Sequence, residues 1–123
     1  MIKQVLLVGL GGAAGSIARY LCQRWVATYY PHPFPWGTFA VNLIGCLLIG
    51  ILWGISFKSF DINEQMKLLL MVGVCGGFTT FSAFTLEGIG LLKENKTGLF
   101  FLYIGGTVIT GLLATYAGMK LVR

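Results

Sequence analysis

The sequence predicts an all-α membrane protein with four transmembrane helices, of which the third is broken at mid-membrane. Of the 123 residues, 56% are hydrophobic and only 11% are charged, whereas a typical soluble domain carries about 25% charged residues. The mean hydropathy of the chain is +0.81. A chain with so little polar surface cannot coat a soluble globule, so its composition places it in the membrane class.

The first two predicted helices are separated by a proline-rich turn. A transmembrane helix needs about 20 mostly apolar residues, and the first such segment covers about residues 4–28. The three prolines of the chain follow within residues 31–35, and they exclude a helix because proline lacks a backbone N–H and clashes with the preceding turn. The second apolar segment covers about residues 36–57.

The third and fourth predicted helices each follow a polar turn. The third segment covers about residues 64–92, and either Asp61 or Asn63 is its expected N-cap. The fourth segment covers about residues 97–121 and follows a short charged turn. We take residues 1–123 as a single transmembrane domain.

The predicted break in the third helix lies near residues 76–80, where two glycines precede two threonines. Non-helical backbone is tolerated at membrane depth only where it is buried in protein or lines a cavity, so a break there points to an ion or substrate site. The carbonyl groups near Gly76 and Thr79 lose helical partners, and such oxygens bind hard cations such as sodium. The positive end of the second half-helix favours an anion.

Helix two carries a polar amide in its apolar middle. Asn42 lies on one face with Thr38 and Gly45. Its side chain either bonds to a neighbouring helix or uses its N–H donors to solvate an anion.

Two phenylalanines follow the break. Phe81 and Phe84 are three residues apart and share a helical face. Two such rings in a membrane helix ordinarily pack against neighbours. An aromatic ring also has a positive edge, so rings turned edge-on to a pathway would favour a small anion over a cation.

Hydroxyl groups also align along helices three and four. Ser82 and Thr85 share a face beside the phenylalanines, while Tyr103, Thr107 and Thr110 form a stripe on helix four. Such hydroxyls either bond to helix carbonyls or form a continuous row of donors along a pathway.

Two charged residues lie inside predicted helices. Arg19 either extends to the membrane interface or lines a vestibule that attracts anions. Glu87 either pairs with a basic residue or lines the exit of the hydroxyl stripe. The three cysteines, Cys22, Cys46 and Cys75, lie in apolar runs without metal-ligand spacing, which indicates buried hydrophobic residues.

The basic residues do not define one orientation in the membrane. The net charge is +5, but the nine basic residues are scattered and mostly flank apolar runs, which indicates membrane anchors rather than a nucleic-acid surface. Their weak asymmetry between the two sides suits insertion in both directions and an antiparallel dimer. Small-xxx-small glycine spacing at residues 11–15, 50–54 and 73–77 predicts close approach of helix backbones.

These motifs together resemble the Fluc/CrcB family of fluoride channels. The resemblance extends over the whole chain and includes residues 11–20, 37–45 and 76–84. The most specific piece is the last, a Gly-Gly-x-Thr-Thr-Phe-Ser-x-Phe string within a short four-span chain. It implies a dual-topology, antiparallel homodimer with two fluoride pathways in a bacterial inner membrane, and a single transmembrane channel domain that exports fluoride passively without enzymatic activity.

The resemblance also implies roles for individual residues. Backbone carbonyls of Gly76 and Thr79 would hold a central structural sodium ion. Thr107 stands where the family commonly has serine, so a hydroxyl group is retained. The residues expected along the ion pathway are Thr38, Asn42, Phe81, Ser82, Phe84, Thr85, Tyr103 and Thr107.

Two other functions remain open at this stage. A small proton-coupled multidrug transporter also uses four spans and dual topology, but it needs an acidic proton carrier deep in the membrane. Helix one has none, and Glu87 is the only candidate. A non-transporting membrane subunit would tolerate substitution of Asn42 and the phenylalanines wherever packing survives.

Overall fold

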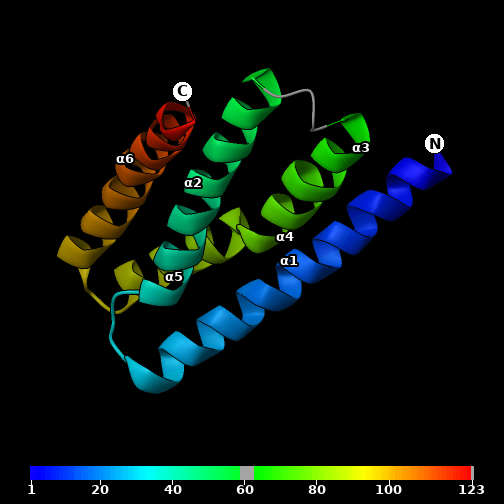
Figure 1. Cartoon of the computed structure of the whole chain (residues 1–123). Helices are drawn as coiled ribbons and strands as arrows, with labels where there is room; N and C mark the ends of the chain where they lie inside the picture. Colours follow the sequence, from blue (N-terminus) through cyan, green and yellow to red (C-terminus); the bar gives the residue numbers. More distant parts are fainter. Residues whose placement is uncertain (59–62, 123) are drawn as a thin grey trace.

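A computed structural model describes residues 1–58 and 63–122, and the described chain is helical apart from short loops and turns (Figure 1). The third apolar segment is divided into four shorter pieces, one of which is a π-helix. In chain order the elements are α1 (Ile2–Tyr29), α2 (Trp36–Lys58), α3 (Glu64–Lys67), the π-helix η1 (Leu68–Cys75), α4 (Gly76–Phe78), α5 (Phe81–Lys93) and α6 (Thr97–Leu121).

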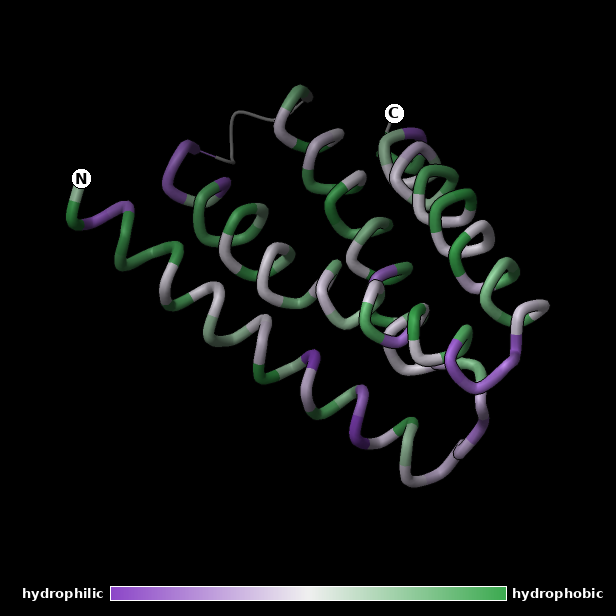
Figure 2. The backbone as a smooth tube through the Cα atoms, turned by 180° about the vertical axis from the view of Figure 1, so that it is seen from behind, coloured by the Kyte–Doolittle hydropathy of each residue, from purple (hydrophilic) through white to green (hydrophobic). Residues whose placement is uncertain are grey.

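The four predicted apolar helices are confirmed. Helical segments long and apolar enough to cross a membrane cover Ile2–Tyr29, Trp36–Phe57, Glu64–Lys93 and Thr97–Leu121. Successive segments run in opposite directions, and the N- and C-termini lie at the same end of the bundle (Figure 1). Hydrophilic residues gather mainly toward helix ends and loops, while the helices are apolar along most of their length (Figure 2).

The third segment is interrupted at Thr79 and Thr80, where the backbone becomes extended, with φ/ψ of −92°/157° and −147°/120°. Thr80 is the N-cap of α5, because its hydroxyl oxygen accepts a hydrogen bond from the backbone N–H of Ala83 at 3.1 Å. The predicted break is therefore present, but it is shorter than expected. The sequence predicts that the break includes Gly76 and Gly77, but both remain helical in α4.

The start of the third segment agrees with one of the two predicted caps. The side-chain oxygen of Asn63 accepts a hydrogen bond from the backbone N–H of Met66 at 2.9 Å, so Asn63 caps α3. The alternative cap, Asp61, lies outside the described residues. The π-helical hydrogen bonding of η1 was not predicted, and apolar periodicity carries no signal that separates it from an α-helix.

The glycines allow helix backbones to touch within this one chain. A Cβ added to Gly77 would lie 2.5 Å from the carbonyl oxygen of Gly12, and one added to Gly11 would lie 2.9 Å from Cα of Gly73. α1 therefore packs directly on η1 and α4, beside which it runs in Figure 1. α2 and α6 approach in the same way, since a Cβ on Gly118 would lie 2.8 Å from the backbone nitrogen of Ile51.

A small aromatic cluster holds α5, α6 and the proline-rich loop together. Phe34, Phe84, Leu91 and Tyr103 form its buried part. The Phe34 and Phe84 rings both meet Tyr103 edge-on, with ring centroids 5.3 Å and 5.1 Å away. This cluster fixes Tyr103 between the loop and the helix that follows the interruption.

Candidate functional site

The side chain of Asn42 bonds twice to the interrupted backbone. Its Nδ2 donates to the carbonyl oxygen of Thr80 at 3.0 Å, and its Oδ1 accepts from the backbone N–H of Thr80 at 2.7 Å. The amide thus replaces the hydrogen bonds that Thr80 loses by leaving the helix. Nδ2 carries a second hydrogen, which remains for another acceptor.

The interruption frees backbone carbonyls from their helical donors, and two of them are those of Gly76 and Thr79. In a continuous helix the N–H of Thr80 would bond to Gly76, and that of Ala83 would bond to Thr79. Here these N–H groups donate instead to the side chains of Asn42 and Thr80. The two carbonyls singled out in the sequence for sodium, those of Gly76 and Thr79, are therefore among those whose usual donors are diverted.

A cavity of about 380 Å³ lies beside the interruption and collects several of the predicted residues. The hydroxyl of Thr107 on α6 is buried and has no hydrogen-bond partner among residues 1–58 and 63–122. An unpaired buried hydroxyl costs about 1–3 kcal/mol, so a bound anion or water would be stabilised there. The predicted site residues that line this cavity are Asn42, Gly76, Thr79, Phe81, Phe84 and Thr107.

The two phenylalanines after the interruption have different environments. Phe84 is 6% exposed and packs on Tyr103, whereas Phe81 is 76% exposed. Their ring centroids are 5.8 Å apart and the rings are tilted by 49°. Phe84 is thus a packing residue as well as a cavity wall, while Phe81 projects from the chain.

The predicted hydroxyl residues are not all brought together. Ser82 and Thr85 are exposed, and Thr85 donates to the carbonyl oxygen of Ser82 at 3.0 Å. The hydroxyl of Thr110 donates to the carbonyl oxygen of Gly106 at 2.6 Å. Of the two roles expected for these hydroxyls, Thr110 therefore bonds to a helix carbonyl.

A second group of polar side chains connects four helical elements. Gln23 on α1 donates from Nε2 to the Thr38 hydroxyl at 3.0 Å, and Tyr103 on α6 donates to Glu87 on α5 at 3.3 Å. Thr38 is 1% exposed and Tyr103 is fully buried, so both hydrogen-bonded pairs include a group in the interior.

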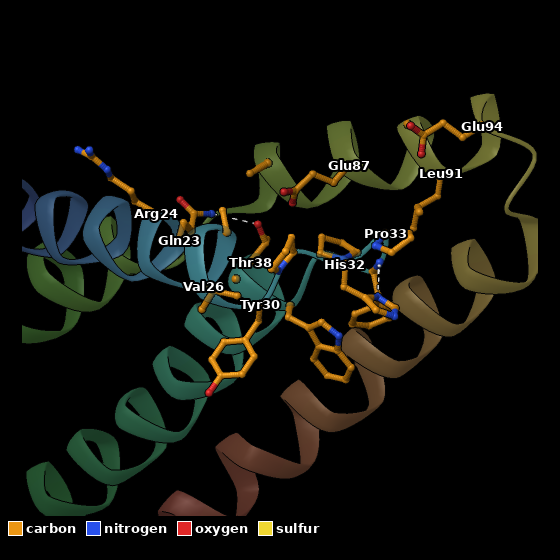
Figure 3. A pocket seen from close by; sticks show the side chains of 18 of the residues that line it. Gln23, Arg24, Val26, Tyr30, His32, Pro33, Thr38, Glu87, Leu91 and Glu94 are labelled. Atoms are coloured by element: carbon orange, nitrogen blue, oxygen red, sulfur yellow. Dashed lines mark hydrogen bonds between the residues drawn. The ribbon is translucent and has the colours of Figure 1, made fainter.

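Gln23, Thr38 and Glu87 line an open crevice of about 770 Å³ near the proline-rich loop. Figure 3 shows Gln23 reaching Thr38, with Glu87 on α5 and Glu94 at the end of that helix across from them. Sequence reasoning missed Gln23, although an amide within an apolar span was a signal available to it. Glu87 takes Tyr103 as its partner rather than a basic residue.

Arg19 lies against the end of α4. Its Nε donates to the carbonyl oxygen of Gly77 at 3.0 Å in a partly buried contact. No ion pair of Arg19 occurs among the residues that the structure describes. The guanidinium therefore places a positive charge close to the interruption, and its other N–H groups remain as donors.

Four apolar helical segments, one of them interrupted beside a buried and unpaired hydroxyl, define a small multi-spanning membrane protein of the channel or transporter class. Residues 6–119 match the sequence profile of the family described as "CrcB-like protein, Camphor Resistance (CrcB)". The chain belongs to this CrcB family, which confirms the resemblance seen in its motifs.

Three bacterial relatives, each named "Fluoride-specific ion channel FluC", align over nearly their whole length. The relative from Phocaeicola vulgatus is 44% identical over 96% of this chain and 97% of its own. The relative from Flavobacterium psychrophilum is 41% identical over 99% and 98%, and that from Methylobacillus flagellatus is 46% identical over 98% and 94%. The family is one of ion channels rather than enzymes, which confirms the prediction of no enzymatic activity.

Proposed function

We propose that this protein is a fluoride-selective passive channel that exports cytoplasmic fluoride and so reduces its toxicity. The observation that carries the proposal is the unpartnered, buried hydroxyl of Thr107 in the cavity at the interruption. Asn42 and Phe81 line the same cavity. Asn42 offers a second N–H as a donor to an anion, and Phe81 offers the positive edge of its ring. The bacterial relatives named as fluoride-specific channels support the choice of ion.

The chemistry of the walls suits a small anion that holds its water tightly. Removing that water requires closely spaced donors, and aromatic edges complete the shell where donors are lacking. The proposed pathway runs past Asn42, Phe81 and Phe84 and continues along exposed and buried hydroxyls. The hydroxyl residues are Thr38, Ser82, Thr85, Tyr103 and Thr107.

Positive charge near the interruption would favour anion entry. The guanidinium of Arg19 is held at the Gly77 carbonyl, and the N-terminus of α5 points its N–H groups at the same region. We assign Arg19 to a vestibule that concentrates fluoride before it enters the narrow part of the pathway.

The functional unit that we propose is an antiparallel, dual-topology homodimer with two pores in a bacterial inner membrane. Each chain forms one transmembrane channel domain over residues 1–123. The exposed ring of Phe81 supports the dimer, because a partner chain would cover it. The glycine motifs do not bear on this assembly, since their contacts are made within the chain.

A central structural sodium ion completes the proposal. The carbonyl oxygens of Gly76 and Thr79 would bind it, because their helical donors are diverted to side chains and carbonyl oxygens suit a hard cation. Two carbonyls from each chain would meet across the dimer axis. Exchange of sodium for a large organic cation during purification is expected to abolish fluoride efflux, with recovery when sodium is restored. Full efflux from protein shown by elemental analysis to hold no sodium would reject the site.

The main alternative, a small proton-coupled multidrug transporter, has weaker support. Glu87, the only acidic residue in the interior of a predicted span, accepts a hydrogen bond from Tyr103 rather than standing free for a substrate. Family membership and the names of the relatives also favour the channel.

The substitution Phe81→Ile tests the role of the aromatic edge. We expect fluoride efflux from liposomes to fall at least roughly tenfold, equivalent to about 1.4 kcal/mol, because isoleucine retains an apolar surface without the positive ring edge. Thermal stability should change little, because Phe81 is 76% exposed within its own chain and isoleucine keeps an apolar surface for the proposed dimer contact. The matched control is Phe101→Ile on α6, which removes another exposed ring. Equal efflux by both variants and the unsubstituted protein would refute the aromatic-edge role.

A further inference from the structure

Three sulfur-bearing side chains line the cavity beside the interruption. Cys46 comes from α2, and Met71 and Cys75 come from η1. The sequence spacing of the cysteines does not indicate a metal site, and the proposed fluoride pathway uses none of the three residues. The fold alone brings them to the wall of one cavity.

Thr79 connects the two cysteine-bearing elements. Its backbone N–H and hydroxyl both donate to the carbonyl oxygen of Cys75, at 3.1 Å and 3.0 Å. Its methyl group lies directly against Gly45, where an added Cβ would collide with it, and Cys46 is the next residue. Met71 and Cys75 lie about one helical turn apart on η1.

We propose that this cavity binds one soft monovalent cation of the Cu⁺ or Ag⁺ type through the sulfur atoms of Cys46, Met71 and Cys75. Thiolate and thioether sulfurs are the ligands that select soft metals. On binding, one cysteine S–H bond breaks, a metal–sulfur bond forms and the proton passes to solvent. No electron is transferred, and the second thiol and the thioether bind as neutral ligands.

The charge balance distinguishes a monovalent ion from zinc. One thiolate neutralises one monovalent cation, and a site without net charge is the least costly in apolar surroundings. Structural zinc takes four ligands from cysteine, histidine and carboxylates. No group of three or more His, Cys, Asp or Glu residues that could hold a metal occurs within residues 1–58 and 63–122.

The bound cation would also obstruct the proposed fluoride pathway. Asn42, Phe81 and Thr107 line the same cavity, so an ion held by the sulfurs would occupy space that fluoride needs. This consequence rests on the proposed function, whereas binding of the metal does not.

Silver binding to the purified protein tests the site directly. The protein is incubated with silver nitrate in chloride-free buffer, passed through gel filtration with an excess of a small thiol competitor that removes silver from single cysteines, and analysed for silver by mass spectrometry. We expect each chain to retain one Ag⁺ and to release one proton per ion, because a thiol must deprotonate. Cys46→Ser and Cys75→Ser should each abolish retention, and Met71→Leu should weaken it about tenfold.

The control variant is Cys22→Ser, because Cys22 is exposed on α1 and lies outside this cavity. It should retain silver as the unsubstituted protein does. Retention that survives both Cys46→Ser and Cys75→Ser, retention that disappears in Cys22→Ser, or binding without proton release would each overturn the proposal. Should a serine variant fail to elute as the folded protein, the corresponding alanine variant takes its place.

Fluoride efflux measured with silver present separates this site from the proposed function. Silver should block efflux through the unsubstituted protein and leave efflux through Cys46→Ser unchanged. Retained silver with unchanged efflux would support the metal site and contradict a fluoride pathway through this cavity.

Discussion

Asn42→Asp should reduce fluoride efflux roughly 100-fold, equivalent to about 2.7 kcal/mol. A carboxylate can still accept from the N–H of Thr80, but it cannot donate to the Thr80 carbonyl as the Asn42 amide does. It also places a negative charge in a cavity through which an anion is proposed to pass. The loss of the donor should lower the free energy of unfolding by about 1–3 kcal/mol. Liposome efflux and thermal melting in detergent measure the two effects.

The control for this substitution is Asn95→Asp. Asn95 lies in the exposed α5–α6 turn with a positive φ of 61°, a backbone conformation that aspartate also tolerates. The same chemical change there should leave efflux and melting unchanged. Efflux through Asn42→Asp that equals efflux through Asn95→Asp would remove Asn42 from the pathway.

Gly77→Ala should produce the largest loss of stability among small substitutions in the third segment. The added Cβ would lie 2.5 Å from the carbonyl oxygen of Gly12 and 3.0 Å from its Cα. Both contacts are with backbone, so the whole of α1 must shift. Overpacking of this kind costs about 1–3 kcal/mol or more. The shift would also disturb the bond from Arg19 to the Gly77 carbonyl, so efflux should fall with the melting temperature.

Gly12→Ala is the matched control. Gly12 lies in the same helix contact as Gly77, but its Cβ position faces open space. Nothing lies within 4 Å of a Cβ added to Gly12. Alanine is the better helix former by about 1 kcal/mol, so this variant should melt at or above the temperature of the unsubstituted protein. Equal melting temperatures for Gly77→Ala and Gly12→Ala would contradict the direct backbone contact between α1 and α4 at these two glycines.

The sequence was sufficient to predict the helical segments because their signals are local. Apolar runs of bilayer length, the prolines before Trp36 and the Asn63 cap each act on neighbouring residues, and the observed ends lie within two residues of the predicted ones. The break was predicted for a partly wrong reason. The glycines Gly76 and Gly77 remain helical, and the extended residues are the threonines that follow.

The missing parts of the site depend on contacts between distant residues. The bond from Arg19 to Gly77 joins positions 58 residues apart, and the bonds from Asn42 to Thr80 join positions 38 apart. Composition and periodicity do not specify such pairs. For the same reason the sequence identified Asn42 and Arg19 as unusual, but it did not identify their partners. Sequence spacing likewise did not predict that Cys46, Met71 and Cys75 line one cavity.

The most direct test of the channel proposal is anion efflux from liposomes that contain the purified protein, measured with ion-selective electrodes. Liposomes loaded with fluoride should empty rapidly once a potassium ionophore balances the charge, without a proton gradient. Liposomes loaded with chloride should retain it. Equal efflux of both anions would contradict fluoride selectivity, and fluoride efflux that requires an imposed proton gradient would contradict a passive channel.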